Sequence, residues 1–146
     1  MISLREYIDD KKAELKAQEE AITKQCEEFT AKVQEWLSGI DDKDFTVELQ
    51  KEKISLDGFY DVEVTIPVVY FFRKAVLFMP ERRDQRNKQN LVGGFYFQLL
   101  GETHSGIAIY KSSAYKGGTV WAYEGKSGGL YELNHRSFGE LLQKSF

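Results

Sequence analysis

Residues 3–38 read SLREYIDDKKAELKAQEEAITKQCEEFTAKVQEWLS, and this stretch decides the fold because it predicts one long helix. It contains neither proline nor glycine. Ser3 and Glu6 have the spacing of a capping box at its start, and a Ser-Gly pair after residue 37 supplies a stop signal. Its apolar residues recur in a strict seven-residue step, at Ile8, Leu15, Ile22, Phe29 and Trp36. The repeat predicts a single apolar stripe along one side of the helix.

The two halves of this helix differ in the apolar surface that they offer. Residues 22–37 have a continuous apolar face suited to packing on a sheet, whereas residues 9–20 offer only Leu15 and alanines. At ~1.5 Å per residue, the whole helix would be about 54 Å long. A compact domain of the ~110 residues that follow has a radius of gyration of ~13–14 Å and a width of about 35 Å. We therefore expect the first half to project, to break, or to be covered by a second molecule.

A projecting first half would be a docking surface. Its apolar residues Tyr7, Ile8 and Leu15 would bind a protein partner or a second copy of the chain. Lys12 and Glu19 fall at two seam positions, which is unfavourable for a simple coiled coil. The alternative is a solvated, frayed helix end without a binding role.

Beyond residue 38 the apolar period changes from near 3.6 to 2, which indicates strands. The segments FTVEL (45–49) and YDVEVTI (60–66) alternate strictly and predict half-buried strands, with an Asp-Gly turn signal between them. Two segments that are apolar on both faces, 68–72 and 75–79, then flank an Arg-Lys pair. They form either a tight hairpin or one long bent strand.

Further strands and a helix complete the pattern. The expected strands are FYFQLL (95–100), GIAIY (106–110), TVWAYE (119–124) and GLYEL (129–133). A last helix runs from about residue 136 to 145, with Asn134 or Ser137 as its cap. The sequence therefore predicts a single α+β domain over residues 1–146. It consists of a long N-terminal helix (1–38), an antiparallel meander sheet of six to eight strands (39–134) and a short C-terminal helix (135–146), with the helices covering one sheet face.

Composition argues against several classes of protein. The one cysteine, Cys26, cannot form an internal disulfide and lies on the apolar stripe, where we expect a small core residue. The start MISLREYIDDKK lacks the apolar segment of a secretory signal, and the longest apolar run, 66–72, is far too short to cross a bilayer as a helix. We therefore expect a cytoplasmic protein that does not associate with membranes. The net charge is −3, and the first half of the chain is acidic, with a net charge of −3 over residues 1–38 and −5 over residues 39–66. This acidic half argues against general affinity for nucleic acid.

One segment is basic, PERRDQRNKQN (80–90). Residues 67–90 carry six cations against two anions, a net charge of +4. Four residues are candidates for binding phosphate: Arg82, Arg83, Arg86 and Lys88. Together with aromatic side chains of the sheet, on which bases could stack, they would bind a single-stranded nucleic acid. The alternative is a solvated loop whose charges keep two apolar strands from aggregating.

Aromatic residues of the sheet are divided between its two faces by alternation. If Phe95 and Phe97 face the helices, then Tyr96 faces away from them. We expect Trp121 and Tyr123 to share that uncovered face, where tyrosine and tryptophan favour contact with a protein partner. The alternative is that these residues simply suit half-buried strands.

No catalytic or metal-binding motif is recognisable. His104 and His135 do not form the paired motifs of two-histidine phosphoesterases, and nothing in the sequence places them together. One cysteine and two histidines make no zinc motif. We therefore expect no metal, no cofactor and no catalytic residue.

The leading hypothesis is a small cytoplasmic, non-enzymatic protein-interaction module of adaptor, immunity or inhibitor type. It would bind a protein partner through the aromatic sheet face and the overhanging helix, with self-association as a further possibility. Binding of single-stranded nucleic acid or of a phosphate ligand through residues 80–90 is the alternative hypothesis. An enzyme with an unrecognised site is the third.

Overall fold

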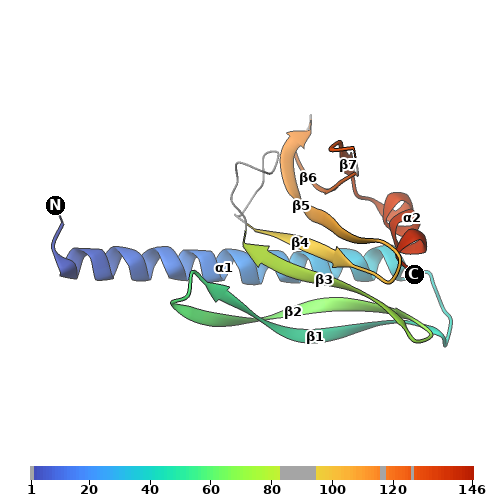
Figure 1. Cartoon of the computed structure of the whole chain (residues 1–146), viewed down its shortest axis with the longest axis horizontal. Coiled ribbons are helices and arrows are strands. Elements are labelled where there is room, and N and C mark those ends of the chain that lie inside the picture. Colours follow the sequence, from blue (N-terminus) through green and yellow to red (C-terminus); the bar gives the residue numbers. More distant parts are fainter. Residues whose placement is uncertain (1, 83–94, 116–117, 126) are drawn as a thin grey trace.

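The long helix is followed by a meander sheet and a second helix. The computed structural model describes residues 2–82, 95–115, 118–125 and 127–146. Its elements are α1 (Leu4–Leu37), β1 (Phe45–Leu56), β2 (Tyr60–Phe71), β3 (Lys74–Arg82), β4 (Phe95–Leu100), β5 (Ser105–Tyr115), β6 (Gly118–Glu124), β7 (Leu130–Glu132) and α2 (His135–Ser145) (Figure 1). Within the described residues, the seven strands pair in chain order and every pairing is antiparallel. The predicted fold class is confirmed.

Helix α1 is continuous from its first turn to its last. The Ser3 side chain caps its start by accepting a hydrogen bond from the Glu6 backbone N–H at 3.1 Å. At its end the Ser38 hydroxyl donates to the Glu35 carbonyl at 2.9 Å. The 34 residues of the helix span about 51 Å at ~1.5 Å per residue. The helix therefore does not break, and of the three expected outcomes only this one is excluded.

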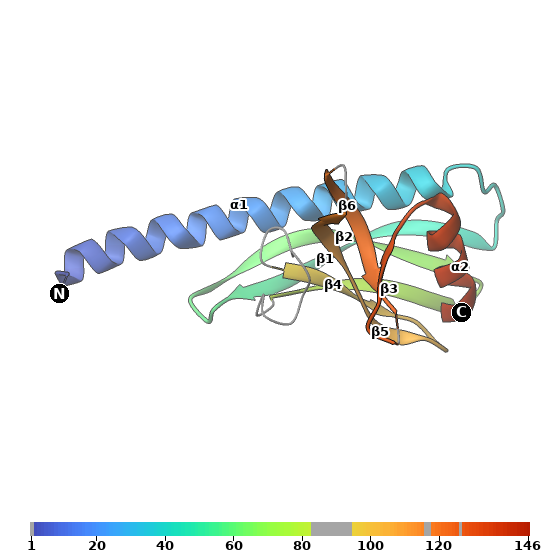
Figure 2. The ribbon, with the colours of Figure 1, turned by 90° about the horizontal axis from the view of Figure 1, so that it is seen from above.

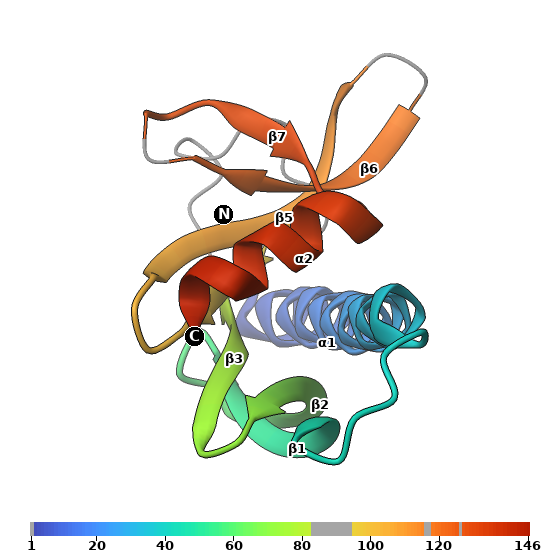
Figure 3. The same cartoon turned by 90° about the vertical axis from the view of Figure 1, so that its right-hand side faces the viewer.

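The core lies between the two helices and the concave face of the sheet. The Phe29 ring of α1 stacks on Phe97 with 4.4 Å between ring centroids and contacts Trp121 at 5.1 Å. Phe138 of α2 packs against Phe78 of β3 at 5.8 Å and against Trp36 of α1 at 5.0 Å. Figure 3 shows the sheet curving around α1, with β1–β3 on one side and β5–β7 on the other.

The segment on both sides of the Arg-Lys pair is a hairpin. Phe71 pairs with Lys74, so Phe72 and Arg73 form a two-residue turn between β2 and β3. The Phe72 backbone has a φ of 54°, a left-handed conformation that bulky residues rarely adopt. The alternative of one bent strand is therefore wrong.

Strands β1 and β2 are longer than the sequence indicated, and this corrects the placement of Leu15. Strand β3 pairs with β2 only at residues 68–71, so the rest of the β1–β2 hairpin is a two-stranded ribbon. A two-stranded ribbon twists strongly, and this one runs alongside α1 (Figure 2). Leu15 is 5% exposed and belongs to the same core cluster as Leu56 near the ribbon tip. The expectation that Leu15 lies on the free surface is wrong because the body is elongated rather than spherical.

The ribbon ends in a tight turn that the sequence did indicate. Asp57 and Gly58 have φ values of 52° and 80°, as a type I′ turn requires. The Phe59 backbone N–H closes the turn by donating to the Leu56 carbonyl at 2.9 Å. This turn fixes where the ribbon stops along α1.

Trp121 does not lie on an uncovered sheet face. It is 6% exposed and packs beneath α1 against Phe29 and Phe97. Alternation places Trp121 and Tyr123 on one face of β6, as expected. That face is the one toward the helices, because the pairing of β6 with β5 sets Trp121 opposite Lys111, whose ammonium group binds Glu28 of α1. The expected orientation of Trp121 and Tyr123 is wrong, since Tyr123 also packs against the main core.

Tyr96 faces away from α1 but is not exposed. It is 4% exposed and forms a second small cluster with Ala108 and Tyr110. Its phenol donates a hydrogen bond to the Glu81 carboxylate at 2.6 Å. The expectation that Tyr96 is available to a protein partner on an uncovered sheet face is therefore wrong, because its side chain is buried.

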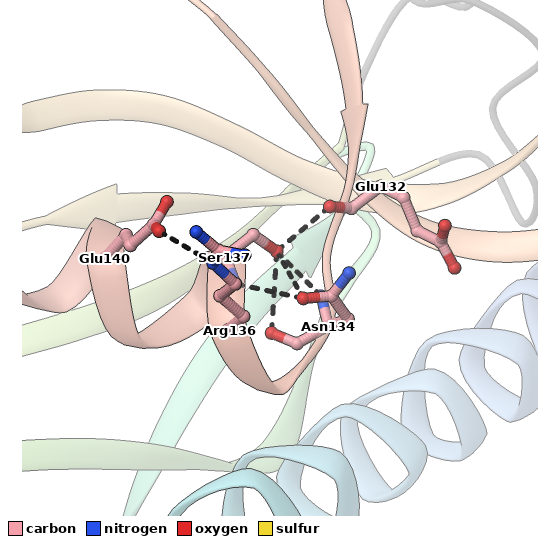
Figure 4. A network of polar contacts seen from close by, with 5 residues as sticks. All are labelled: Glu132, Asn134, Arg136, Ser137 and Glu140. Atoms are coloured by element: carbon pink, nitrogen blue, oxygen red, sulfur yellow. Dashed lines mark hydrogen bonds and ion pairs between the residues drawn. The ribbon is translucent and has the colours of Figure 1, made fainter.

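Helix α2 begins with a reciprocal capping arrangement (Figure 4). The Ser137 backbone N–H donates to the Asn134 side chain at 2.9 Å, and the Asn134 backbone N–H donates to the Ser137 hydroxyl at 2.8 Å. The Ser137 hydroxyl also donates to the Glu132 carbonyl at 3.0 Å, which ties the cap to β7. Of the two predicted caps, Asn134 is the N-cap and Ser137 is its partner.

Candidate functional site

The first turns of α1 extend beyond the body. Figures 1 and 2 show the N-terminal part of the helix continuing past the tip of the β1–β2 ribbon without a neighbouring element. We name residues 2–14 the arm. Leu4 is 74% exposed, Ile2 54% and Tyr7 48%, while Ile8 is half-buried. The arm therefore carries several large apolar side chains that the body does not cover.

The exposed residues of the arm continue the stripe that α1 buries elsewhere. Ile8, Leu15 and Ile22 are seven residues apart, which is nearly two turns, so they lie on one side of the helix. Leu15 and Ile22 are 5% and 1% exposed. The stripe becomes exposed because the sheet ends, not because the stripe turns away from the sheet.

The ribbon tip borders this stripe. Phe59 is 52% exposed, and the Lys11 ammonium group lies 5.0 Å from the centre of its ring. Next to it, the Tyr60 phenol donates to the Glu19 carboxylate at 3.5 Å. The arm and the ribbon tip thus meet at a corner, and we name Leu4, Tyr7, Ile8 and Phe59 together the arm surface.

Local contacts keep the arm helical where tertiary contacts are few. Arg5 pairs with Asp9 at 3.3 Å, and Lys11 pairs with Glu14 at 3.4 Å, both between neighbouring turns. Exposed pairs of this kind contribute about 0.3–0.5 kcal/mol each. The main support is continuity with the packed part of the helix, since elongating an existing helix avoids the cost of a new nucleus.

A cavity of about 600 Å³ lies between α2, β6, β7 and the loop after β4. His104, Tyr123, Tyr131, Glu140 and Lys144 are among its lining residues. Burial first, and then the charge of Glu140 and the neighbouring Tyr131, raise the pKa of Tyr123.

The cavity does not assemble the two histidines. His135 begins α2 and is exposed, whereas His104 lines the cavity. Glu140 is paired with Arg136 at 3.3 Å, so its carboxylate already has a cation beside it. Among the lining residues, the Thr103 hydroxyl donates to the Lys144 carbonyl rather than to a base. Neither of these two contacts is a nucleophile–base pair.

The remaining predicted residues fall in two groups. Cys26 is 2% exposed in the core, as expected, and burial followed by the charge of Glu27 raises the pKa of its thiol to about 12. Arg82 ends β3. Arg83, Arg86 and Lys88 lie outside the described residues, so their predicted role in phosphate binding stays a prediction.

Neither a metal site nor a membrane span is found in the part of the chain that the structure describes. No cluster of three or more His, Cys, Asp or Glu side chains there could hold a metal ion. No described helix is long and apolar enough to cross a bilayer.

A second exposed apolar surface was not anticipated. At the opposite end of the molecule from the arm, Phe72 is 65% exposed, Ile40 50% and Phe71 40%. The sequence signal was two adjacent phenylalanines directly before an Arg-Lys pair. The apolar run 68–72 predicts a strand that is apolar on both faces, whereas Phe72 lies in the turn between β2 and β3.

Comparison of the chain with protein-family models, with curated proteins and with solved structures gives no match.

Proposed function

We propose that this protein is a small non-enzymatic interaction module whose arm surface binds an apolar-faced helix of a partner protein. One observation carries the proposal: the stripe that α1 buries from Leu15 onward is exposed at Leu4 and Tyr7. A soluble chain that keeps large apolar residues on a free helix loses solubility and gains no folding energy from them. A contact surface is the use that their position supports.

A helix is the partner element that fits this surface. The exposed side chains follow the i, i+3, i+4 spacing by which one helix packs beside another. Phe59 at the ribbon tip lies beside the arm, so a partner helix that packs along the arm can also contact the exposed Phe59 ring. Charges of both signs flank the stripe, which favours a partner whose helix also carries charges beside its apolar face.

The magnitudes favour a moderate affinity. Full burial of one large apolar side chain stabilises a complex by about 1.5–3 kcal/mol. Association itself costs about 4–15 kcal/mol. Leu4, Tyr7 and Ile8 alone are therefore marginal, and Phe59 together with the partner's own apolar face has to contribute.

The alternative of single-stranded nucleic-acid binding has weaker support. Such surfaces need aromatic side chains on which bases can stack. Tyr96 and Trp121, the residues expected to supply them, are 4% and 6% exposed.

The test is a differential capture from the native host at low salt. The baits are the wild-type protein, a Leu4→Asp/Ile8→Asp variant and an Ala13→Asp/Ala17→Asp variant, which carries the same two new charges at exposed alanines on the polar side of α1. We expect a protein that is captured by the wild type and by the Ala13/Ala17 variant but not by the Leu4/Ile8 variant. Capture that is equal for all three baits, or the absence of a captured protein, contradicts the proposal.

A further inference from the structure

Four phenylalanine rings form a surface cluster at the end of the molecule that lies opposite the arm. The Phe71 ring lies 4.9 Å from Phe72, 5.7 Å from Phe146 and 6.2 Å from Phe45, measured between centroids. Phe72 and Phe71 are 65% and 40% exposed, and Ile40 beside them is 50% exposed. An exposed cluster of this kind marks a contact surface more strongly than single exposed residues do.

Phe72 occupies a position that its side chain makes unfavourable. Its φ of 54° is a conformation suited to glycine or asparagine, and a bulky residue is strained there. The strain gives no compensating burial, since most of the ring is in solvent. The Phe72 N–H donates to the Asp44 carbonyl at 2.7 Å and so fixes the turn against the loop after α1. The ring is thus presented rigidly to the outside, and strained residues of this kind are concentrated at functional surfaces.

An apolar groove opens on the same end. Its volume is about 230 Å³, and Leu37, Ile40, Phe45, Leu142 and Phe146 are among its lining residues. A cavity of about 150 Å³ already accommodates benzene. The groove is therefore large enough for one phenylalanine ring.

The two sides of this end have opposite charges. Arg73 lies in the β2–β3 turn and is exposed, whereas Asp41 and Asp42 lie in the exposed loop between α1 and β1. Figure 3 looks onto this end, with the β2–β3 turn at the lower left and the α1–β1 loop at the right. Basic and acidic side chains thus stand on different sides of one face.

We propose that this face is a two-fold interface with a second copy of the chain, in which Phe72 of each copy enters the groove of the other. A projecting ring, a groove and two opposite charges on one face are self-complementary. A two-fold axis in the plane of contact brings the turn of each copy to the loop of the other, so that Arg73 faces Asp41 twice. The arms then point away from each other at the two ends of the dimer.

Sedimentation velocity over a dilution series tests the interface, with the Phe72→Asn variant beside the wild type. Asparagine accepts the left-handed conformation, so this variant relieves strain while it removes the ring. We expect the wild type to dimerise with increasing concentration and the variant to remain monomeric. At a concentration at which both proteins are monomers, the melting temperature of the variant is expected not to be lowered. A matched Phe59→Asn variant, which removes the exposed ring at the other end, is expected to dimerise as the wild type does.

A charge exchange gives an independent readout. Arg73→Glu and Asp41→Lys are each expected to weaken the dimer, because each brings like charges together twice. An equimolar mixture of the two variants is expected to form a heterodimer, since both contacts then join opposite charges. Lys74 is left unchanged because its ammonium group donates to the Phe146 carbonyl at 2.8 Å.

Two outcomes overturn the interface. One is a wild-type protein that stays monomeric at every concentration. The other is a dimer that survives Phe72→Asn and fails to respond to the mixture of charge variants. Neither outcome bears on the proposed binding of a partner by the arm surface, because that proposal is tested separately with the Leu4→Asp/Ile8→Asp variant.

Discussion

Two parts of α1, residues 4–14 and residues 15–37, carry one apolar stripe and have different surroundings. Residues 15–37 bury it against the sheet and α2, with Phe29 fully buried at its centre. Residues 4–14 leave it in solvent, with Leu4 three-quarters exposed. The pattern in the sequence determines the side of the helix that is apolar, whereas the length of the β1–β2 ribbon determines how much of that side is covered. The uncovered part is then available to another molecule.

The two parts of α1 are expected to differ most in the unfolding free energy that is lost when a large apolar residue in each is replaced by alanine. Phe29→Ala removes a ring that contacts Phe78, Phe97 and Trp121. A cavity at such a site costs about 3–5 kcal/mol of unfolding free energy. Leu4→Ala, at an exposed site, is expected to change it by no more than about 0.5 kcal/mol. Urea unfolding of both variants measures the contrast, and similar losses in the two would contradict it.

The position at which α1 changes from covered to uncovered can be tested with alanine substitutions at Leu15 and Ile8. Leu15→Ala is expected to cost about 2–5 kcal/mol because the ribbon covers this side chain. Ile8→Ala, one heptad earlier and only half-buried, is expected to cost clearly less. If urea unfolding gave Ile8 the larger loss, the ribbon would have to cover more of α1 than it does here.

The two helix starts offer a smaller contrast. Asn134→Ala removes the side-chain oxygen that accepts from the Ser137 backbone N–H at the start of α2, and is expected to cost about 1 kcal/mol. The bonds of the Ser137 hydroxyl with the Asn134 backbone N–H and with the Glu132 carbonyl of β7 are left in place. Ser3→Ala removes the N-cap of α1, which lies in the arm. Fraying of the first turn there leaves the packed residues 15–37 in place. We expect almost no change in global unfolding free energy, and thermal unfolding of both variants compares them.

The last comparison concerns the pH dependence at Cys26. Burial raises the pKa of its thiol from 9.0 in the unfolded chain to about 12. Above pH 9 the unfolded chain loses this proton while the folded chain keeps it, so the contribution of the thiol to stability is present below pH 9 and falls as pH rises toward 12. The stability difference between wild type and Cys26→Ala is therefore expected to narrow between pH 8 and pH 11. A constant difference in urea unfolding over that range would show that the thiol is not buried as described.

Sequence periodicity predicted the elements that have strong local signals. The bounds of α1 and β4 agree with the prediction, because capping residues and a dense aromatic segment mark them. Residues 50–56 were not predicted as strand, since Lys51, Glu52 and Lys53 interrupt the alternation. That omission shortened the ribbon, and Leu15 was consequently assigned to the free surface.

Features that depend on how the elements are arranged in space were not predicted. The orientation of Trp121 toward α1 follows from the pairing and curvature of the sheet, which no local pattern encodes. The burial of Tyr96 follows from its contacts with β5. The phenylalanine cluster joins residues from three separate segments, at Phe45, Phe71–Phe72 and Phe146. In contrast, Tyr7 was correctly placed on an exposed part of the helix, because α1 is long enough to extend past the tip of the β1–β2 ribbon.

Hydrogen exchange along α1 at low protein concentration tests the central comparison most directly. We predict that backbone amides from about residue 18 to 37 exchange only through global unfolding, because they share the buried core. Amides of residues 7–14 are predicted to exchange much faster, by fraying of an arm that few contacts hold. Equal protection along the whole helix in the monomer would contradict the account, since the arm would then be covered within its own chain and would have no free surface to offer a partner.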